Sequence, residues 1–130
     1  MQSILLIEDN TNLLDNLAEY LEMEGYHIFS TNKGETGIEL ARQHIPDLII
    51  CDNPKPGIDG QEVLRLLINS SHTSEIPFIF STTLSEPINR SEALVLGADD
   101  YLIKPFELET LLDMAKTCIQ SGSKRQNCIF

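Results

Sequence analysis

The sequence has few basic residues, and no apolar run in it is long. Nine lysine and arginine residues stand against twenty aspartate and glutamate residues, which gives a net charge of -11. A surface of that sign repels nucleic-acid phosphates and anionic lipids, so direct binding to nucleic acid or to a membrane is not expected. The first apolar run, in "SILLIED", is too short for a secretory signal or a membrane span.

Cysteine is also scarce. The three cysteines, Cys51, Cys118 and Cys128, are an odd number without metal-ligand spacing. Cys51 ends an apolar run that is typical of a buried strand, so it is expected to be a packing residue. Reduced thiols of this kind favour a cytoplasmic location.

The 130 residues have the length of one domain, with no internal repeat and no low-complexity tract. Five short apolar runs alternate with five segments of helical period, which is the pattern of a parallel sheet wrapped by helices. We predict an α/β protein, a doubly wound three-layer α/β/α sandwich, over residues 1–121. Residues 122–130 are expected to form a polar tail or the start of a linker. The strands are predicted at residues 3–7, 26–30, 48–51, 78–80 and 101–103.

The helical segments each carry an apolar stripe that is expected to face the sheet. Gly25 is expected to end the first helix, because glycine tolerates a left-handed conformation. The second stripe ends before Pro46, and the fourth is the weakest. The positions predicted to face inward in these two stripes are Ile38, Ala41, Ile45, Ala93, Leu94 and Leu96.

Polar residues follow four of the predicted strands, where ligands bind in open parallel sheets. Three carboxylates among them would repel one another unless a cation lay between them, and Mg²⁺ or Mn²⁺ suits such oxygen ligands. Lys104 and Thr82 could hold phosphoryl oxygens, while Asp52, fixed by its strand, could act as a nucleophile. The residues expected to converge on this crevice are Glu8, Asp9, Asp52, Ser81, Thr82 and Lys104.

The motifs "LLIEDN", "PDLIICD" with "PGIDG", "IPFIFSTT" and "GADDYLIKPF" together resemble a response-regulator receiver domain of two-component signalling. The resemblance runs from Ile4 to about Cys118. It implies a chemotaxis-regulator-like fold with the flavodoxin-like strand order 2-1-3-4-5. It also implies a phosphoacceptor domain rather than an enzyme, phosphorylated by a histidine kinase or a phosphotransfer protein.

Carried over residue by residue, the resemblance makes Asp52 the phosphoacceptor and a metal ligand. Asp9 becomes a direct Mg²⁺ ligand, Glu8 a ligand through water, and the carbonyl of Pro54 the third protein ligand.

The same resemblance makes Thr82 the switch hydroxyl, Lys104 the phosphoryl-binding lysine and Tyr101 the switch aromatic. A cis peptide is expected between Lys104 and Pro105. Phosphorylation is expected to draw Thr82 toward the phosphoryl group, to let Tyr101 turn inward, and to repack the surface of the fourth helix, fifth strand and fifth helix. That surface is where an output domain, a partner protein or a second copy would bind.

Three residues depart from the usual family pattern: Pro54, Thr83 and Leu84. Neither Pro54 nor Leu84 has a side chain that can orient an attacking water by hydrogen bonding, and Thr83 narrows access. We therefore expect a slowly hydrolysed phosphoryl group.

Other functions are weighed against the same residues. A haloacid-dehalogenase-type phosphatase would need an aspartate where Pro54 stands, and a flavodoxin-like cofactor site would need a phosphate-binding loop where "EDNTN" stands. A degenerate receiver, binding partners without phosphorylation, stays open. Residues expected to have ordinary structural roles are Asp59 as a helix cap, Ser81 as a strand-end hydroxyl, Asp99 and Asp100 in a turn, and His27, His44 and His72 at the surface.

Overall fold

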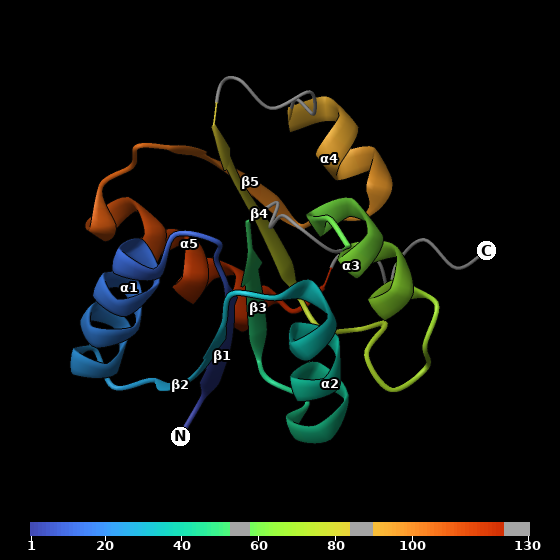
Figure 1. Ribbon diagram of the computed structural model, residues 1–130, viewed down its shortest axis with the longest axis horizontal. Coiled ribbons are helices and arrows are strands. Elements are labelled where there is room, and N and C mark those ends of the chain that lie inside the picture. The colour runs from blue at the N-terminus through green and yellow to red at the C-terminus, as the bar shows by residue number, and fades with distance from the viewer. Residues whose placement is uncertain (53–57, 84–89, 124–130) are drawn as a thin grey trace.

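The computed structural model describes residues 1–52, 58–83 and 90–123 (Figure 1). Five strands and five helices alternate along the chain. The strands are β1 Ser3–Ile7, β2 His27–Thr31, β3 Leu48–Cys51, β4 Phe78–Thr83 and β5 Asp100–Lys104. The helices are α1 Thr11–Met23, α2 Gly34–His44, α3 Gly60–Ile68, α4 Arg90–Leu96 and α5 Leu108–Ser121.

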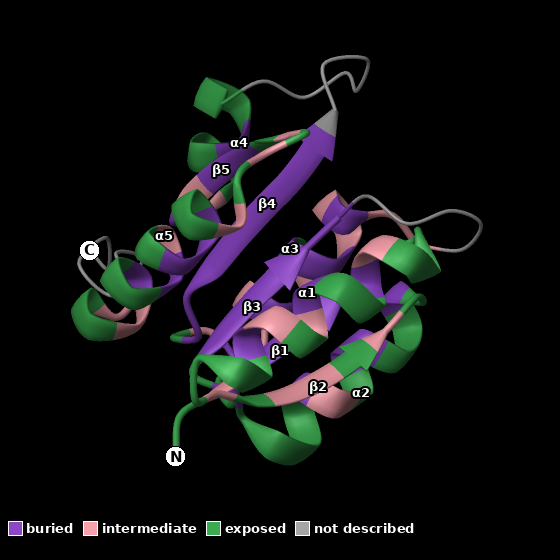
Figure 2. Ribbon diagram, turned by 90° about the vertical axis from the view of Figure 1, so that its left-hand side faces the viewer, coloured by how far each residue is buried: buried purple, intermediate pink, exposed green. Residues whose placement is uncertain are grey.

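The strands form one parallel sheet in the order β2-β1-β3-β4-β5, as predicted. Helices α1 and α5 cover one face, and α2, α3 and α4 cover the other (Figure 1). The central strands are buried on both faces, whereas the edge strand β2 is partly exposed (Figure 2). The result is the predicted three-layer sandwich, with its apolar core divided into two clusters by the sheet.

The strand boundaries confirm the prediction for β1 and β3 and correct it elsewhere. β2 lies one residue later than predicted, and β5 is one residue longer at each end. β4 continues three residues beyond the predicted end at Phe80, because Ser81, Thr82 and Thr83 pair with β5. Ser81 and Thr82 therefore lie within the strand and not after it, and Lys104 is the last residue of β5.

Helix α1 follows its apolar stripe, with Leu14, Leu17 and Leu21 buried, and Gly25 has the expected positive φ of 99°. The prediction for Ile45 was wrong. Helix α2 ends at His44, and Ile45 is a left-handed C-cap that is 44% exposed. Pro46 disfavours helical geometry in the residue before it, so the helix ends before Ile45 can join the stripe. Within the described residues, no helix has the length and apolar character needed to cross a membrane.

The stripe predicted for α4 was also mostly wrong. Ala93 is fully buried against the sheet, but Leu94 and Leu96 are 40% and 44% exposed and Val95 is 86% exposed. Helix α4 has seven residues, about two turns, so only one position on it points squarely at the core. Its apolar residues therefore contribute to the protein surface.

Candidate functional site

Four of the predicted site residues, Glu8, Asp9, Asp52 and Lys104, meet at the carboxyl end of the sheet. Lys104 Nζ lies 2.8 Å from Glu8 Oε1 and 3.2 Å from Asp52 Oδ1, forming ion pairs with both carboxylates. The backbone N–H of Asp9 donates to Asp52 Oδ2 at 3.3 Å. Strands β1, β3 and β5 thus bring together four residues that are distant in the sequence.

Burial differs sharply among the three carboxylates. Glu8 is only 3% exposed, and its Oε2 accepts the N–H of Asn10 at 3.0 Å. Asp52 is 8% exposed, whereas Asp9 is exposed to solvent. The site is therefore a buried acid pair with a third acid at its open side.

The electrostatics of the site follow from this burial. Desolvation raises the pKa of Glu8, and the nearby charge of Asp52 adds to the increase, although Lys104 and the Asn10 N–H oppose it. Burial alone would lower the pKa of Lys104, but its hydrogen bond with Glu8 and the charges of Glu8 and Asp52 raise it overall. Lys104 is therefore held as a cation beside two buried carboxylates.

The donor set suits a hard cation. Carboxylate oxygens are the ligands that Mg²⁺ prefers, and a cation among them would favour their charged forms, opposing the effect of burial on Glu8. In the part of the chain that the structure describes, no three acidic, histidine or cysteine side chains are arranged as a ready metal cluster. The ammonium of Lys104 supplies the positive charge between Glu8 and Asp52 instead.

Thr82 and Tyr101 lie on the two strands beside this acid cluster. Thr82 is fully buried opposite Ile103 in β5. Tyr101 is 7% exposed and belongs to the core cluster that contains Ala93 of α4, so its side chain already has an inward position. Its carbonyl oxygen accepts a hydrogen bond from Arg90 at the start of α4. Tyr101 therefore packs into the core beside α4.

Several other predicted features can be located. The peptide between Lys104 and Pro105 is cis, as expected. The hydroxyl of Ser81 is buried and has no hydrogen-bond partner among the described residues. Pro54 and Leu84 lie outside the described residues, and so does the predicted contribution of Pro54 to a metal site. The side chain of Thr83 is likewise outside the description.

Asp59 caps α3, as predicted, by accepting the N–H of Glu62 at 2.9 Å. The next residue, Gly60, lies against the site: a Cβ there would come within 2.6 Å of the carbonyl oxygen of Asp52 and 2.8 Å of Cε1 of Phe80. Only glycine fits this close approach without a shift of the backbone.

Sequence reasoning missed the structural role of Asp99, which it assigned to a turn. Asp99 is 6% exposed, and its Oδ2 accepts the N–H of Phe78 at 2.9 Å while its Oδ1 accepts the hydroxyl of Ser123 at 3.4 Å. Asp100 belongs to β5 and pairs with Arg90. No local pattern reveals such contacts, because the partners come from β4 and from the residues after α5.

The histidines lie at the surface, as predicted. The rings of both His27 and His44 nevertheless contact the ring of Phe29, the first edge-on with a centroid distance of 4.7 Å and the second stacked at 4.2 Å. These contacts cover Phe29 on the edge strand β2, which is a packing role.

The model of the family "Response regulator receiver domain" matches residues 4–116. The chain is 36% identical to protein PilH of Pseudomonas aeruginosa over 112 residues, which cover 86% of this chain and 93% of PilH. It is 35% identical to the transcriptional regulatory protein AfsQ1 of Streptomyces coelicolor over 95% of this chain and 54% of AfsQ1. The chain belongs to the response regulator receiver domain family, the phosphoacceptor domains of two-component systems.

A solved receiver domain has a similar fold. The receiver domain of a sensor histidine kinase from Pseudomonas aeruginosa superposes with a TM-score of 0.78 at 27% identity, covering 92% of this chain and 98% of that domain. That structure is described with a magnesium ion coordinated in its active site cleft. The chain spans about half the length of AfsQ1, so the comparison with AfsQ1 concerns the receiver portion. The degenerate-receiver alternative is not favoured by these relatives.

Proposed function

We propose that Asp52 is the phosphoacceptor of this receiver domain. The observation that carries the proposal is the position of its carboxylate, at the end of β3, within ion-pair distance of Lys104 and within hydrogen-bond distance of the Asp9 N–H. A nucleophile fixed by a buried strand and flanked by positive donors is arranged for in-line attack on phosphorus. Thr82 and Lys104 are the groups that would contact the phosphoryl oxygens.

The proposed reaction is a phosphoryl transfer from a phosphohistidine. A carboxylate oxygen of Asp52 forms a bond to phosphorus while the bond between phosphorus and the imidazole nitrogen breaks, and the imidazole leaves with that electron pair. Lys104 stabilises the charge on the transferred group. The product is an aspartyl phosphate, which makes the domain a signalling phosphoacceptor that promotes only its own phosphorylation and dephosphorylation.

Mg²⁺, or Mn²⁺ in its place, is the proposed cofactor, held by Glu8, Asp9, Asp52 and the carbonyl of Pro54. When bound, such an ion neutralises charge on the phosphoryl oxygens. The geometry supports this assignment, because Glu8 and Asp52 are both buried and share the same ammonium group, so a cation beside them would stabilise their charged forms.

The proposed switch links Asp52 to the surface formed by α4, β5 and α5. Thr82 would bond to the phosphoryl group, and Tyr101 would be held in its inward position against α4. Leu94 and Leu96 of α4 and Ile103 of β5 are exposed apolar residues of this region, between 40% and 44% exposed. An output domain, a partner protein or a second copy is the proposed ligand of this surface.

The proposed phosphodonor is a sensor histidine kinase or a phosphotransfer protein. A hollow of about 350 Å³, lined by Lys104 and by apolar side chains, supports the docking of a donor protein there. The residues that line it are Leu13, Lys104, Pro105, Phe106 and Leu108.

We further propose that residues 1–121 form the receiver unit and that 122–130 begin a tail or linker. The buried thiol of Cys51, which is in no disulfide, supports a cytoplasmic location.

The test is phosphorylation by acetyl phosphate, followed by intact mass. The wild-type chain with Mg²⁺ should gain one phosphoryl group, and Asp52→Asn should gain none. Asp15→Asn, an exposed acid on α1, is the matched control and should behave as wild type. Addition of a metal chelator should abolish the gain. Phosphorylation of Asp52→Asn to the wild-type level would refute the assignment, and no gain by any variant, even with a histidine kinase as donor, would indicate a degenerate receiver.

A further inference from the structure

Ser81 in β4 carries a polar group in the core. Its side chain is 2% exposed, and its hydroxyl has no hydrogen-bond partner among the described residues. A buried hydroxyl without a partner destabilises the folded protein, and alanine would occupy the same position without that penalty. The hydroxyl is therefore a candidate contact for a group that binds to the protein.

The side chain of Ser81 faces the α1 and α5 side of the sheet. Side chains alternate between the two faces along a strand. Phe78 and Phe80 belong to the core cluster on the α2, α3 and α4 side, whereas Ile79 belongs to the cluster on the other side. Ser81 comes two residues after Ile79 in the same strand, so the two share a face.

On this face Ser81 is the neighbour of Asp52. Ile50 of β3 is paired with Ile79, so Asp52, two residues further along, is level with Ser81. Asp52 still follows the line of the strand, because its N–H donates to the carbonyl of Ile7 in β1 at 2.7 Å. Neighbouring strands lie about 4.8 Å apart, so the two side chains stand next to each other.

The side chain of Lys104 crosses β4 to reach Asp52. Strand β4 separates β5 from β3, a distance of about 9.6 Å in all. Lys104 Nζ nevertheless lies 3.2 Å from Asp52 Oδ1. Ser81 is paired with Leu102, two residues before Lys104 and on the same face. The hydroxyl of Ser81 therefore lies on the strand that the lysine crosses, level with the acid that the lysine reaches.

We propose that the Ser81 hydroxyl donates a hydrogen bond to the carboxyl group of Asp52 once a phosphoryl group is bound there. In this structure Lys104 pairs with Oδ1 of Asp52, and the Asp9 N–H donates to Oδ2. When Lys104 turns to the phosphoryl oxygens, the carboxyl group loses a donor, and Ser81 replaces it. Ser81 then stabilises the phosphorylated state relative to the unphosphorylated one. This inference rests on the proposed role of Asp52.

Room for Lys104 is the competing explanation for a serine at this position. A short side chain on β4 lets the lysine cross, and alanine would serve that purpose as well as serine. Both explanations predict that Ser81→Ala folds and that its thermal midpoint rises, because an unpaired buried hydroxyl is removed. Only the proposed hydrogen bond predicts that the variant binds a phosphoryl group less tightly.

Beryllofluoride is the probe, because it binds a carboxylate oxygen as a phosphoryl group does, and reversibly. Titration with Mg²⁺ present, followed by amide shifts in ¹⁵N-labelled protein, gives the Kd. Ser81→Ala should weaken binding about tenfold, the effect of one hydrogen bond. Ser81→Cys keeps a side chain of similar shape but is a weak donor, so it should weaken binding to a similar extent. Ser30→Ala, which removes an exposed serine from the edge strand β2, is the matched control and should bind as wild type.

The proposal is overturned if Ser81→Ala binds beryllofluoride as tightly as wild type, because room for the lysine would then explain the serine. It is also overturned if Ser81→Cys alone binds as wild type, since packing would then be the cause. A thermal midpoint that does not rise in Ser81→Ala would show that the hydroxyl is already paired, and would overturn it too. Failure of the role of Asp52 is read without any Ser81 variant: wild type would bind no beryllofluoride, or Asp52→Asn would bind it equally well, and the inference about Ser81 would fall with it.

Discussion

The ammonium group of Lys104 lies 2.8 Å from Oε1 of Glu8, although 96 residues separate the two along the chain. This ion pair connects the last residue of β5 to the residue that follows β1. It also places the lysine beside Asp52, so that one cation serves two buried acids.

Lys104→Ala should destabilise the protein by about 2 kcal/mol, between the values for exposed and fully buried ion pairs. The loss arises because Glu8 and Asp52 would face each other without a cation. Urea unfolding measures it, with Lys116→Ala on the exposed face of α5 as the control. Mg²⁺ should reduce the loss, since it would replace the missing charge. Equal effects of the two substitutions would show that the Lys104 ion pairs contribute nothing.

Asp99→Ala should lower the free energy of unfolding by about 1–3 kcal/mol, because it removes the acceptor for the N–H of Phe78 at the start of β4. Asp99→Asn should cost less, since the amide oxygen can still accept that hydrogen bond. Thermal or urea unfolding separates the two, with Asp113→Ala, an exposed acid on α5, expected to be close to neutral. If Asp99→Asn lowered the free energy of unfolding as much as Asp99→Ala, the charge of Asp99 would account for its contribution to stability, and the hydrogen bond would not.

The thiol of Cys51 should make stability fall at alkaline pH. Burial, with a smaller effect from the charge of Asp52, raises its pKa well above the ordinary value of 9.0. As pH rises above 9.0, the unfolded chain loses this proton and the folded chain keeps it, so the unfolded state is favoured by up to about 1.4 kcal/mol per pH unit. The difference in unfolding free energy between wild type and Cys51→Ala should therefore shrink from pH 8 to pH 10. If this difference in unfolding free energy stayed constant over that pH range, the pKa of the Cys51 thiol would not be raised by burial.

The phosphoryl group on Asp52 should be lost slowly. Pro54 and Leu84 offer no hydrogen bond to an attacking water, so hydrolysis lacks an orienting group. Intact mass after removal of acetyl phosphate gives the decay rate, and Leu84→Gln should increase it by several-fold. Rapid decay in the wild type, or no change in Leu84→Gln, would show that these two positions do not control the lifetime.

Much of the fold could be predicted because apolar runs and helical periods are local signals. The runs in β1 and β3 are apolar to their last residue, so their ends at Ile7 and Cys51 were predicted correctly. The prediction that the acids after these strands lie close together was also possible from the sequence, because it needs only the strand positions and their parallel arrangement. Parallel strands bring their carboxyl ends to one edge, whatever their separation in sequence.

The errors in the prediction arose where contacts between distant parts of the chain determine the structure. The end of β4 is polar, and only its pairing with Lys104 and the residues before it shows that Thr83 is still strand. The sequence pattern predicted Leu94 and Leu96 as core residues, but a helix as short as α4 buries little more than Ala93. Asp99 resembles a turn residue because its partners, Phe78 and Ser123, are far away in the chain.

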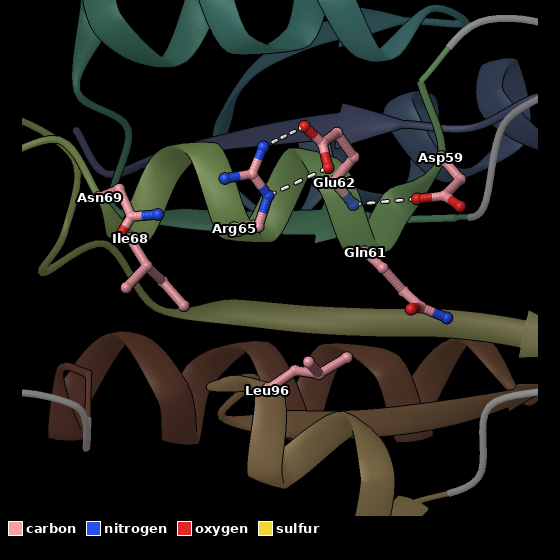
Figure 3. A pocket seen from close by; sticks show the side chains of 7 residues that line it. All are labelled: Asp59, Gln61, Glu62, Arg65, Ile68, Asn69 and Leu96. Atoms are coloured by element: carbon pink, nitrogen blue, oxygen red, sulfur yellow. Dashed lines mark hydrogen bonds and ion pairs between the residues drawn. The ribbon is translucent and has the colours of Figure 1, made fainter.

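The close approach at Gly60 has a consequence beyond packing. Because no side chain separates this residue from the carbonyl of Asp52, the first turn of α3 rests directly on the backbone that carries the acid. Helix α3 also forms one wall of a hollow of about 330 Å³ that Leu96 of α4 borders (Figure 3). We therefore expect a displacement of the Asp52 backbone to press first on the N-terminal turn of α3, with no side chain between them to absorb it.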